Sequence, residues 1–353
     1  MNCSKTNLPV EVVFHPSWWN RNAGIVFDED FFYDPRRRVE DERKMEQVLY
    51  DRFGRWGLGA DRNRNLPQIG AVHNAAGYLL SEMLGCSVIY AEDSAPKVVC
   101  AHRENDSVDV EAAFSSRPFR RLVQLVDDLK ARYGYVCGDV NWSGVLNLAM
   151  DLRGEGILMD MLEEPETCPA YLNAIADVVE RFFTYVQGQT GTTSISVNRL
   201  VRHLGEPVFV HSECSHTMIS EACYREFLQP IDRRWALAHR PFGIHHCGKD
   251  PHRFAACYAE LPQLAFLDVG WGGDVAALRA ALPNTFLNIR LNPVEINGYS
   301  DAEFDQIVID RVRASGDPRL TGVCCINMDD TVSDARVERL FALAEELREG
   351  RLG

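Results

Sequence analysis

The chain has 353 residues, of which 46% are hydrophobic and 25% are charged, and this composition is typical of a globular protein that can bury a full core. Its net charge of −14 argues against a nucleic-acid partner, because phosphate backbones are bound mainly by clustered Lys and Arg. The N-terminus holds no apolar leader, and no later run approaches the roughly 18 apolar residues of a membrane helix. We therefore expect a cytoplasmic protein without a membrane partner, whose 11 cysteines are buried thiols or metal ligands.

The N-terminal third has the least regular pattern. Helices are expected over residues 33–57 and 71–84, and a strand over 87–93. The basic run at 36–38 is diluted by neighbouring Asp and Glu, so we interpret it as part of a solvated face. We expect the section 1–130 to cap one end of the remaining fold.

From there onward, short apolar runs alternate with segments of helical periodicity. The expected strands lie at 133–140, 206–212, 242–247, 263–270, 285–291 and 320–327. The expected helices between and after them lie at 171–189, 222–240, 250–261, 274–282, 301–314 and 333–350. Apolar strands alternating with helices predict parallel β-structure, either doubly wound or closed into a barrel. Since no Gly-rich dinucleotide fingerprint is present, we favour an α/β TIM (β/α)8 barrel, with 1–353 as one domain and 1–130 as its N-terminal capping extension.

The stretch IHHCGKD, residues 244–250, ends one of the expected strands. Active sites of α/β barrels lie at the carboxyl ends of the strands. Because side chains alternate along a strand, His245 and Cys247 point one way and His246 the other. The first pair can therefore offer one nitrogen and one sulfur to the same metal ion.

A further thiolate is expected from the last predicted strand, where Cys324 and Cys325 precede the loop INMDD. Only one of the two can share a face with the His245 and Cys247 pair. One nitrogen and two sulfurs would leave a tetrahedral zinc ion one open position, as in catalytic sites, and thiolates favour Zn²⁺ over Mg²⁺ or Ca²⁺. The alternative is that these cysteines are core thiols, since free Cys is among the most buried residue types.

Other candidate residues follow neighbouring strands. Within VFVHSECSHTM (208–218), Glu213 is a candidate fourth zinc ligand, a general acid, or a solvated loop carboxylate. His211 in the same segment is a candidate for substrate contact, and His216 is interpreted as structural.

Two further residues are candidates for substrate binding. Asn141 follows the expected strand at 133–140, and Trp19 lies in the N-terminal segment. An aromatic wall formed by Trp18, Trp19 and Trp142 would suit an apolar or methoxyaromatic substrate, although each is also an ordinary core residue.

The segment IHHCG, followed by a helix and then by FLDVGWGGDVAALRAALPNTFLNIRLNP, resembles the uroporphyrinogen decarboxylase superfamily. It is most similar to the zinc-dependent, corrinoid-linked methyltransferases, such as the methanol and methylamine coenzyme M methyltransferases. The likeness runs from about residue 133 to the end and includes MDMLEEPE (159–166) and SEACYREFLQP (220–230). In that family, an H-x-C-G segment and a cysteine on a late strand bind zinc in a TIM barrel, which implies His245, Cys247 and either Cys324 or Cys325 here.

The resemblance implies methyl transfer between a small substrate, a methoxy compound or a thiol, and a corrinoid on a partner protein. The motif Asp250-x-His252-x-x-Ala255 lacks the glycine of corrinoid-binding proteins, so we expect the corrinoid (cobalamin) to be carried by the partner. A homodimer is one assembly that the sequence allows.

The sequence departs from true uroporphyrinogen decarboxylases at NRNAGIV (20–26), which keeps only the Arg-x-Ala-Gly part of their R-Q-A-G-R-Y segment. A cofactor-free decarboxylase is therefore the second interpretation. A non-catalytic barrel that binds zinc or a tetrapyrrole is the third.

Overall fold

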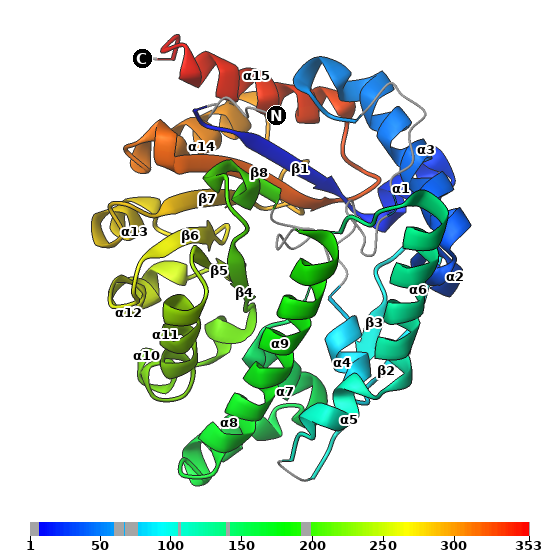
Figure 1. Cartoon of the computed structure of the whole chain (residues 1–353). Coiled ribbons are helices and arrows are strands. Elements are labelled where there is room, and N and C mark those ends of the chain that lie inside the picture. Colours follow the sequence, from blue (N-terminus) through cyan, green and yellow to red (C-terminus); the bar gives the residue numbers. More distant parts are fainter. Residues whose placement is uncertain are drawn as a thin grey trace.

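The fold is built on one curled, parallel β-sheet. A computed structural model describes residues 7–59, 67, 77–104, 107–138, 142–191 and 199–352. Within them, six strands pair in the order β1-β8-β7-β6-β5-β4, and every neighbouring pair is parallel. They are β1 (Val10–Phe14), β4 (Phe209–Ser212), β5 (Phe242–His246), β6 (Leu264–Val269), β7 (Phe286–Leu291) and β8 (Thr321–Met328). Figure 1 shows these strands fanned round one side of the molecule, as in a TIM-like fold.

Helices cover the sheet and close the side opposite to it (Figure 1). They are α1 (Pro16–Ala23), α2 (Glu29–Tyr33), α3 (Pro35–Phe53), α4 (Leu79–Met83), α5 (Val110–Phe114), α6 (Arg117–Tyr133), α7 (Val145–Arg153), α8 (Gly156–Glu163), α9 (Cys168–Thr190), α10 (Glu221–Cys223), α11 (Gln229–Ala238), α12 (Ala255–Ala259), α13 (Val275–Ala281), α14 (Asp301–Ala314) and α15 (Asp334–Arg348). None of the described helices is long and apolar enough to cross a membrane.

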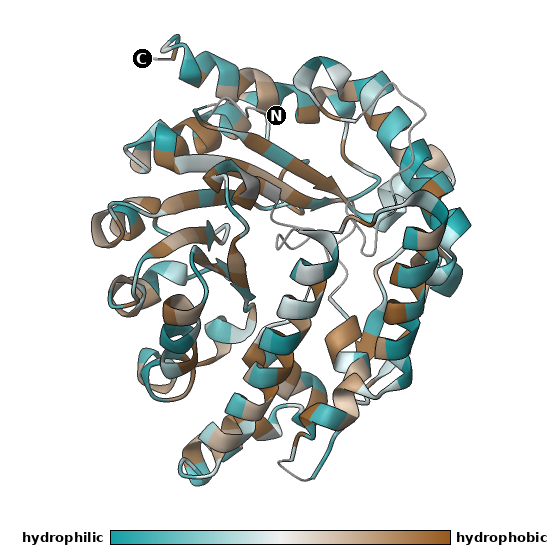
Figure 2. Ribbon diagram, viewed as in Figure 1, coloured by the Kyte–Doolittle hydropathy of each residue, from teal (hydrophilic) through white to brown (hydrophobic). Residues whose placement is uncertain are grey.

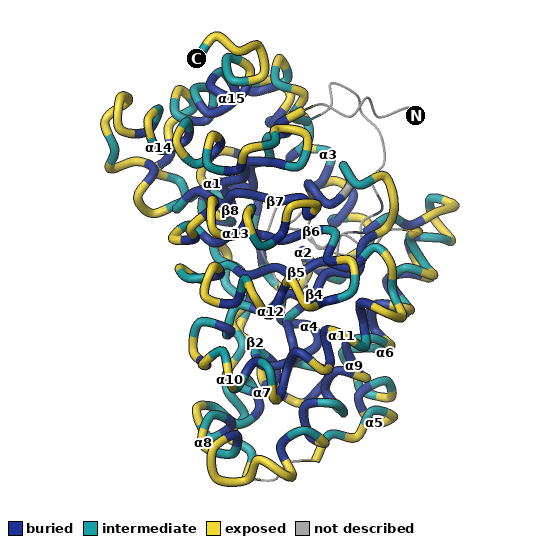
Figure 3. The backbone as a smooth tube through the Cα atoms, turned by 90° about the vertical axis from the view of Figure 1, so that its left-hand side faces the viewer, coloured by how far each residue is buried: buried dark blue, intermediate teal, exposed yellow. Residues whose placement is uncertain are grey.

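Strands and helices divide polar from apolar surface in different ways. The strands of the six-stranded sheet are mostly apolar (Figure 2) and form the buried layer at the centre of the molecule (Figure 3). The helices keep one apolar face toward that layer and expose the other. Strands buried on both faces are what a parallel sheet covered by helices requires.

The five strands predicted between 206 and 327 are confirmed as β4 to β8. A closed barrel of eight strands is not established, because the described residues form a parallel sheet of six strands. The segment 87–93 contributes β2 (Ser87–Ile89), which pairs antiparallel with β3 (Lys97–Val99) in a separate two-stranded sheet. Of the strand expected at 133–140, Tyr133 ends α6 and Cys137 N–H donates to Pro67 O, while its last two residues lie outside the described part of the chain.

Part of the N-terminal section belongs to the sheet, which the expectation of a separate cap missed. β1 pairs with β8, so the first and last described strands are neighbours, and Arg348 at the end of α15 donates to Leu8 O. The pattern VEVVF is too short to predict a strand by itself. Its pairing could not be predicted locally either, because its partner β8 lies about three hundred residues away in the chain. The solvated face expected at 36–38 is wrong for Arg38, which is buried and pairs with buried Glu42 at 2.7 Å.

Candidate metal centre

One imidazole and two thiols converge where β4 and β5 end. The ligand atoms of Cys214, His245 and Cys247 all lie within 4.8 Å of one another. Ser212 is the register partner of His245, so residue 214 follows β4 at the same level as residue 247 follows β5. Carboxyl ends of neighbouring parallel strands are where TIM-like folds carry their chemistry. The predicted convergence of His245 and Cys247 is thus present in the fold, with Cys214 as its third member.

The His245 ring is held from behind by a carboxylate. His245 Nδ1–H donates to Asp268 Oδ2 at 2.5 Å, and Asn288 Nδ2 donates to Asp268 Oδ1 at 2.6 Å. Residues 245, 268 and 288 are register partners on β5, β6 and β7, and all three are buried. Although burial disfavours the imidazolium, the hydrogen bonds with Asp268 and Cys247 raise the pKa of His245. This contact fixes the tautomer and leaves Nε2 facing the thiols, as carboxylates do for metal-binding histidines.

A hydrogen bond links the two thiols. The hydrogen bond from Cys214 lowers the pKa of Cys247 to about 3, with further help from His245 and Arg290 against the effect of burial. The same bond raises the pKa of Cys214 well above its usual value. Thiolate, not thiol, is the form that binds metals and attacks electrophiles.

A buried cation lies beside this group. Arg290 on β7 places Nη1 3.2 Å from His245 Nε2, and its Nε has no hydrogen-bond partner among the described residues. Burial disfavours its charge, but the neighbouring Cys324, Cys247 and Asp268 raise the pKa of Arg290. The guanidinium therefore offsets negative charge at the thiols and occupies the lone pair that a metal would need.

The structure does not bring Cys324 or Cys325 into this group. Cys324 is the register partner of Arg290 on β8, so the two share a face, and the guanidinium interacts electrostatically with Cys324 as well as with Cys214 and Cys247. Cys325 points the opposite way, with its Sγ 3.9 Å from Leu291 O. Burial raises the pKa of Cys325 to about 12. That either cysteine is a metal ligand stays a prediction.

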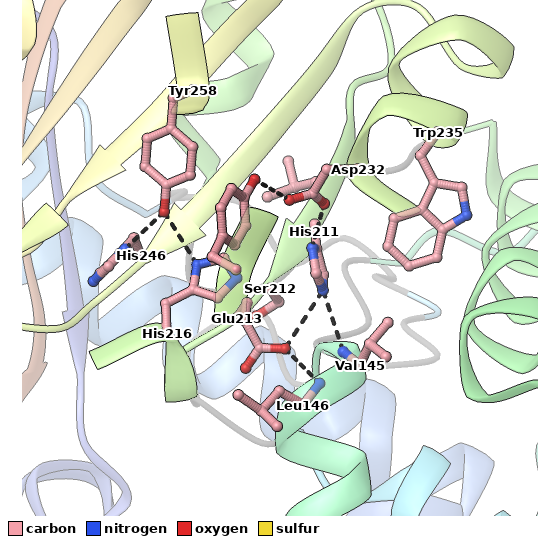
Figure 4. Close-up of polar contacts among 12 residues, drawn as sticks. Val145, Leu146, His211, Ser212, Glu213, His216, Asp232, Trp235, His246 and Tyr258 are labelled. Atoms are coloured by element: carbon pink, nitrogen blue, oxygen red, sulfur yellow. Dashed lines mark hydrogen bonds and ion pairs between the residues drawn. The ribbon is translucent and has the colours of Figure 1, made fainter. Parts of the chain in front are cut away.

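Glu213 has turned away from the thiols and caps α7. Its carboxylate accepts the backbone N–H of Leu146 at 2.7 Å (Figure 4) and that of Asn147 at 3.2 Å. Helix N-termini favour such a negative charge. The approach requires Gly144, where an added Cβ would lie 2.5 Å from Glu213 Oε2. Glu213 is fully buried, so it is not the solvated loop carboxylate that was one of its predicted roles. Its predicted roles as a zinc ligand or a general acid stay predictions.

A second group, of His211, His216 and Asp232, lies on the helix side of the sheet. His211 Nδ1–H donates to Asp232 Oδ1 at 2.6 Å, and Tyr224 O–H donates to Asp232 Oδ2 at 2.6 Å (Figure 4). Burial alone would lower the pKa of His211, but Asp232, followed by Glu213, raises it to about 9. All of these side chains are fully buried, so substrate contact by His211 stays a prediction that the burial does not support.

A tyrosine links two further histidines behind the sheet. The Tyr258 hydroxyl lies 2.9 Å from His246 Nδ1 and 3.1 Å from His216 Nδ1 (Figure 4). Burial lowers the pKa of both rings, to about 4 in His246. The alternation expected in IHHC therefore sends His245 to one face and His246 to a neutral, aromatic environment on the other.

The remaining candidates are divided between the core and the undescribed part of the chain. Trp19 is fully buried and packs edge-to-face against Trp18 and Phe14. Trp142 is buried and donates to Val210 O. Asn141 lies outside the described residues. Substrate contact by Trp19 and Asn141 stays a prediction.

Sequence reasoning missed Cys214, Asp268 and Arg290. A signal for Cys214 was present, because strand alternation through H-S-E-C places residues 212 and 214 on one face and Glu213 on the other. Asp268 in FLDVG had a similar signal, as a single carboxylate within an apolar strand. For Arg290 the sequence alone gives no indication that its side chain enters the site.

The chain resembles known proteins in its three-dimensional structure and not in its sequence. No family model matches the chain, and no curated protein matches it. A solved methyltransferase from Methanosarcina mazei has a TM-score of 0.66 and 12% sequence identity, with 97% of this chain and 94% of that one covered. A putative vitamin-B12 independent methionine synthase from Listeria monocytogenes has a TM-score of 0.45 and 10% identity, covering 97% and 99%. The first of these likenesses shows that nearly the whole chain shares the fold of that protein.

Proposed function

We propose that the protein is a zinc-dependent methyltransferase that moves a methyl group between a small substrate, a methoxy compound or a thiol, and a corrinoid carried by a partner protein. The observation that carries the proposal is the convergence of Cys214, His245 and Cys247 at the carboxyl ends of two strands in a TIM-like fold. The solved protein from Methanosarcina mazei with the same fold is itself described as a methyltransferase, which supports this class of activity.

The residues present fit a zinc ion. One imidazole nitrogen and two sulfurs are the donor types that zinc prefers, and three protein ligands leave a fourth position for a reactant. Asp268 holds the imidazole in the required tautomer. The one obstacle is Arg290, which contacts His245 Nε2 at 3.2 Å and must move aside when a metal is bound.

Zinc in such a site would hold a thiol as its thiolate near neutral pH, or polarise the oxygen of a methoxy group. The protein's own residues set the conditions for this. Cys214, His245 and Cys247 would hold the ion, Asp268 orients the imidazole, and the Arg290 guanidinium would offset the added negative charge of a bound thiolate after moving away from His245 Nε2. Glu213 is fixed by α7, so its carboxylate supports the loop that carries Cys214.

A partner protein is the proposed source of the corrinoid. His252, the only imidazole in the near-match to the corrinoid-ligand motif, lies in the short 3-10 helix Pro251–Phe254 and accepts a hydrogen bond from Asp274 N at 3.2 Å. That contact occupies one ring nitrogen within the fold, which agrees with a corrinoid that comes from outside the chain.

Metal analysis of the full-length protein tests the metal centre. We expect about one zinc per chain, lost in Cys247→Ser and in Cys214→Ser and retained in the matched variant Cys223→Ser, whose thiol lies on α10 outside the group. Parallel Cys324→Ser and Cys325→Ser variants decide whether a late-strand thiol also binds. Absence of stoichiometric metal in the wild-type protein would contradict the proposal.

Methyl transfer is tested separately with methylated phenols, amines and thiols. Reduced free cobalamin serves as the acceptor, and the appearance of methyl-cobalt is followed by absorbance. Turnover that depends on the bound zinc is expected, whereas full activity of a metal-free protein on an acidic tetrapyrrole would favour decarboxylation instead.

A further inference from the structure

Cys214 and Cys247 occupy matched positions on neighbouring strands. Ser212 and His245 are register partners, and Glu213 N–H donates to His245 O at 3.0 Å, so the pairing continues past the end of β4. The two cysteines are each two residues beyond that register pair. Neighbouring strands lie about 4.7–4.9 Å apart, which falls within the Cα separation of about 4.4–6.8 Å that disulfides require.

Their sulfur atoms are also close, and neither residue is fully buried. The two Sγ atoms lie within 4.8 Å of each other, and both residues are partly exposed. By contrast, Cys324 and Cys325 on β8 and Cys257 on α12 are buried. The pair thus combines proximity with partial exposure of both residues, which the buried cysteines lack.

We propose that Cys214 and Cys247 form a reversible disulfide, so that the pair is a modification site for a hydroperoxide oxidant and a dithiol reductant. One sulfur attacks the peroxide, the O–O bond breaks, and a sulfenic acid and water are produced. The second sulfur then attacks the first, the S–S bond forms, the S–O bond breaks and a second water leaves. Two thiols lose two electrons and two protons while hydrogen peroxide is reduced to two waters, and a dithiol reverses the change by exchange.

Oxidation would remove two of the three ligand atoms at the candidate metal centre. A disulfide sulfur carries no thiolate charge, so only His245 would remain to hold an ion. This consequence rests on the proposed function, whereas the disulfide itself does not. Bound zinc is expected to protect both sulfurs from oxidation, which would make the metal-free protein the sensitive form.

The test treats full-length protein, metal-free and zinc-loaded, with one equivalent of hydrogen peroxide. We expect the metal-free protein to lose about 2 Da and to yield a cross-linked peptide pair containing Cys214 and Cys247, both reversed by dithiothreitol. Cys214→Ser and Cys247→Ser should abolish the cross-link, and Cys223→Ser should retain it. Mapping in the wild-type protein does not depend on whether any variant folds.

Free thiols at both positions after treatment, or overoxidation of either one without a cross-link, would overturn the inference. The two proposals fail in different ways. A cross-link in a protein that never binds zinc would keep the redox pair and remove the metal centre. Stoichiometric zinc with no cross-link in the metal-free form would do the reverse.

Discussion

Two clusters that each contain a histidine and a carboxylate lie on opposite faces of β4 and β5, and they differ in how far their side chains are buried. On the helix face, His211 and Asp232 are fully buried and bond to each other and to Tyr224. On the inner face, His245 donates to Asp268, while Cys214 and Cys247 lie beside the imidazole and are partly exposed. A histidine–carboxylate pair thus belongs to a fully buried network in one place and lies beside two partly exposed thiols in the other. The contrast predicts that one cluster supports stability and the other supports ligand binding.

The largest effect is expected from Asp232→Asn in the closed network. The change removes the charge that faces buried His211, and breaking a buried pair costs about 3 kcal/mol of unfolding free energy. Urea unfolding measures the loss. The control Asp177→Asn changes a half-exposed carboxylate on α9 and should cost less than about 1 kcal/mol. Equal effects from the two variants would remove the distinction between the clusters.

The same network predicts a pH dependence of stability. Because Asp232 and Glu213 raise the pKa of His211 to about 9, the folded protein binds this proton more tightly than the unfolded chain does. The contribution is fully present below about pH 6.5 and is lost as the pH rises through about 9. Unfolding measured from pH 6 to 10 should show this decline, and Asp232→Asn should flatten it. A midpoint near pH 6.5 in an NMR titration of the His211 ring would contradict the prediction.

In the open cluster, Asp268→Asn should affect metal affinity more than stability. Loss of the carboxylate behind a ligating histidine typically weakens metal binding about 10- to 100-fold. Chelator competition measures the change in zinc affinity. Asp310→Asn, an exposed carboxylate on α14, is the matched control and should leave the affinity unchanged. If Asp268→Asn changes stability but not metal affinity, the inner cluster is structural as well.

The smallest effect is expected at Gly144, which lies against Ser212 and Glu213 between His211 and Cys214 in the chain. An added Cβ would lie 2.5 Å from Glu213 Oε2 and 2.6 Å from Ser212 O, so Gly144→Ala should cost about 1–2 kcal/mol by overpacking. Gly156→Ala has open space around its Cβ and should be neutral or slightly stabilising. Thermal unfolding compares the two. A neutral Gly144→Ala would mean that Glu213 is free to leave the end of α7.

The sequence by itself determined which segments become buried parallel strands and which of their side chains share a face. Runs such as FGIHHC and FLNIRL are rich in apolar residues and are buried on both faces, as a helix-covered sheet requires, and alternation alone separates His245 from His246. The tertiary structure decided which distant residues meet. Strand order and register placed Cys214 beside Cys247, Asp268 beside His245 and Arg290 beside Cys324. These outcomes depend on pairing between strands far apart in the chain, which no local pattern encodes.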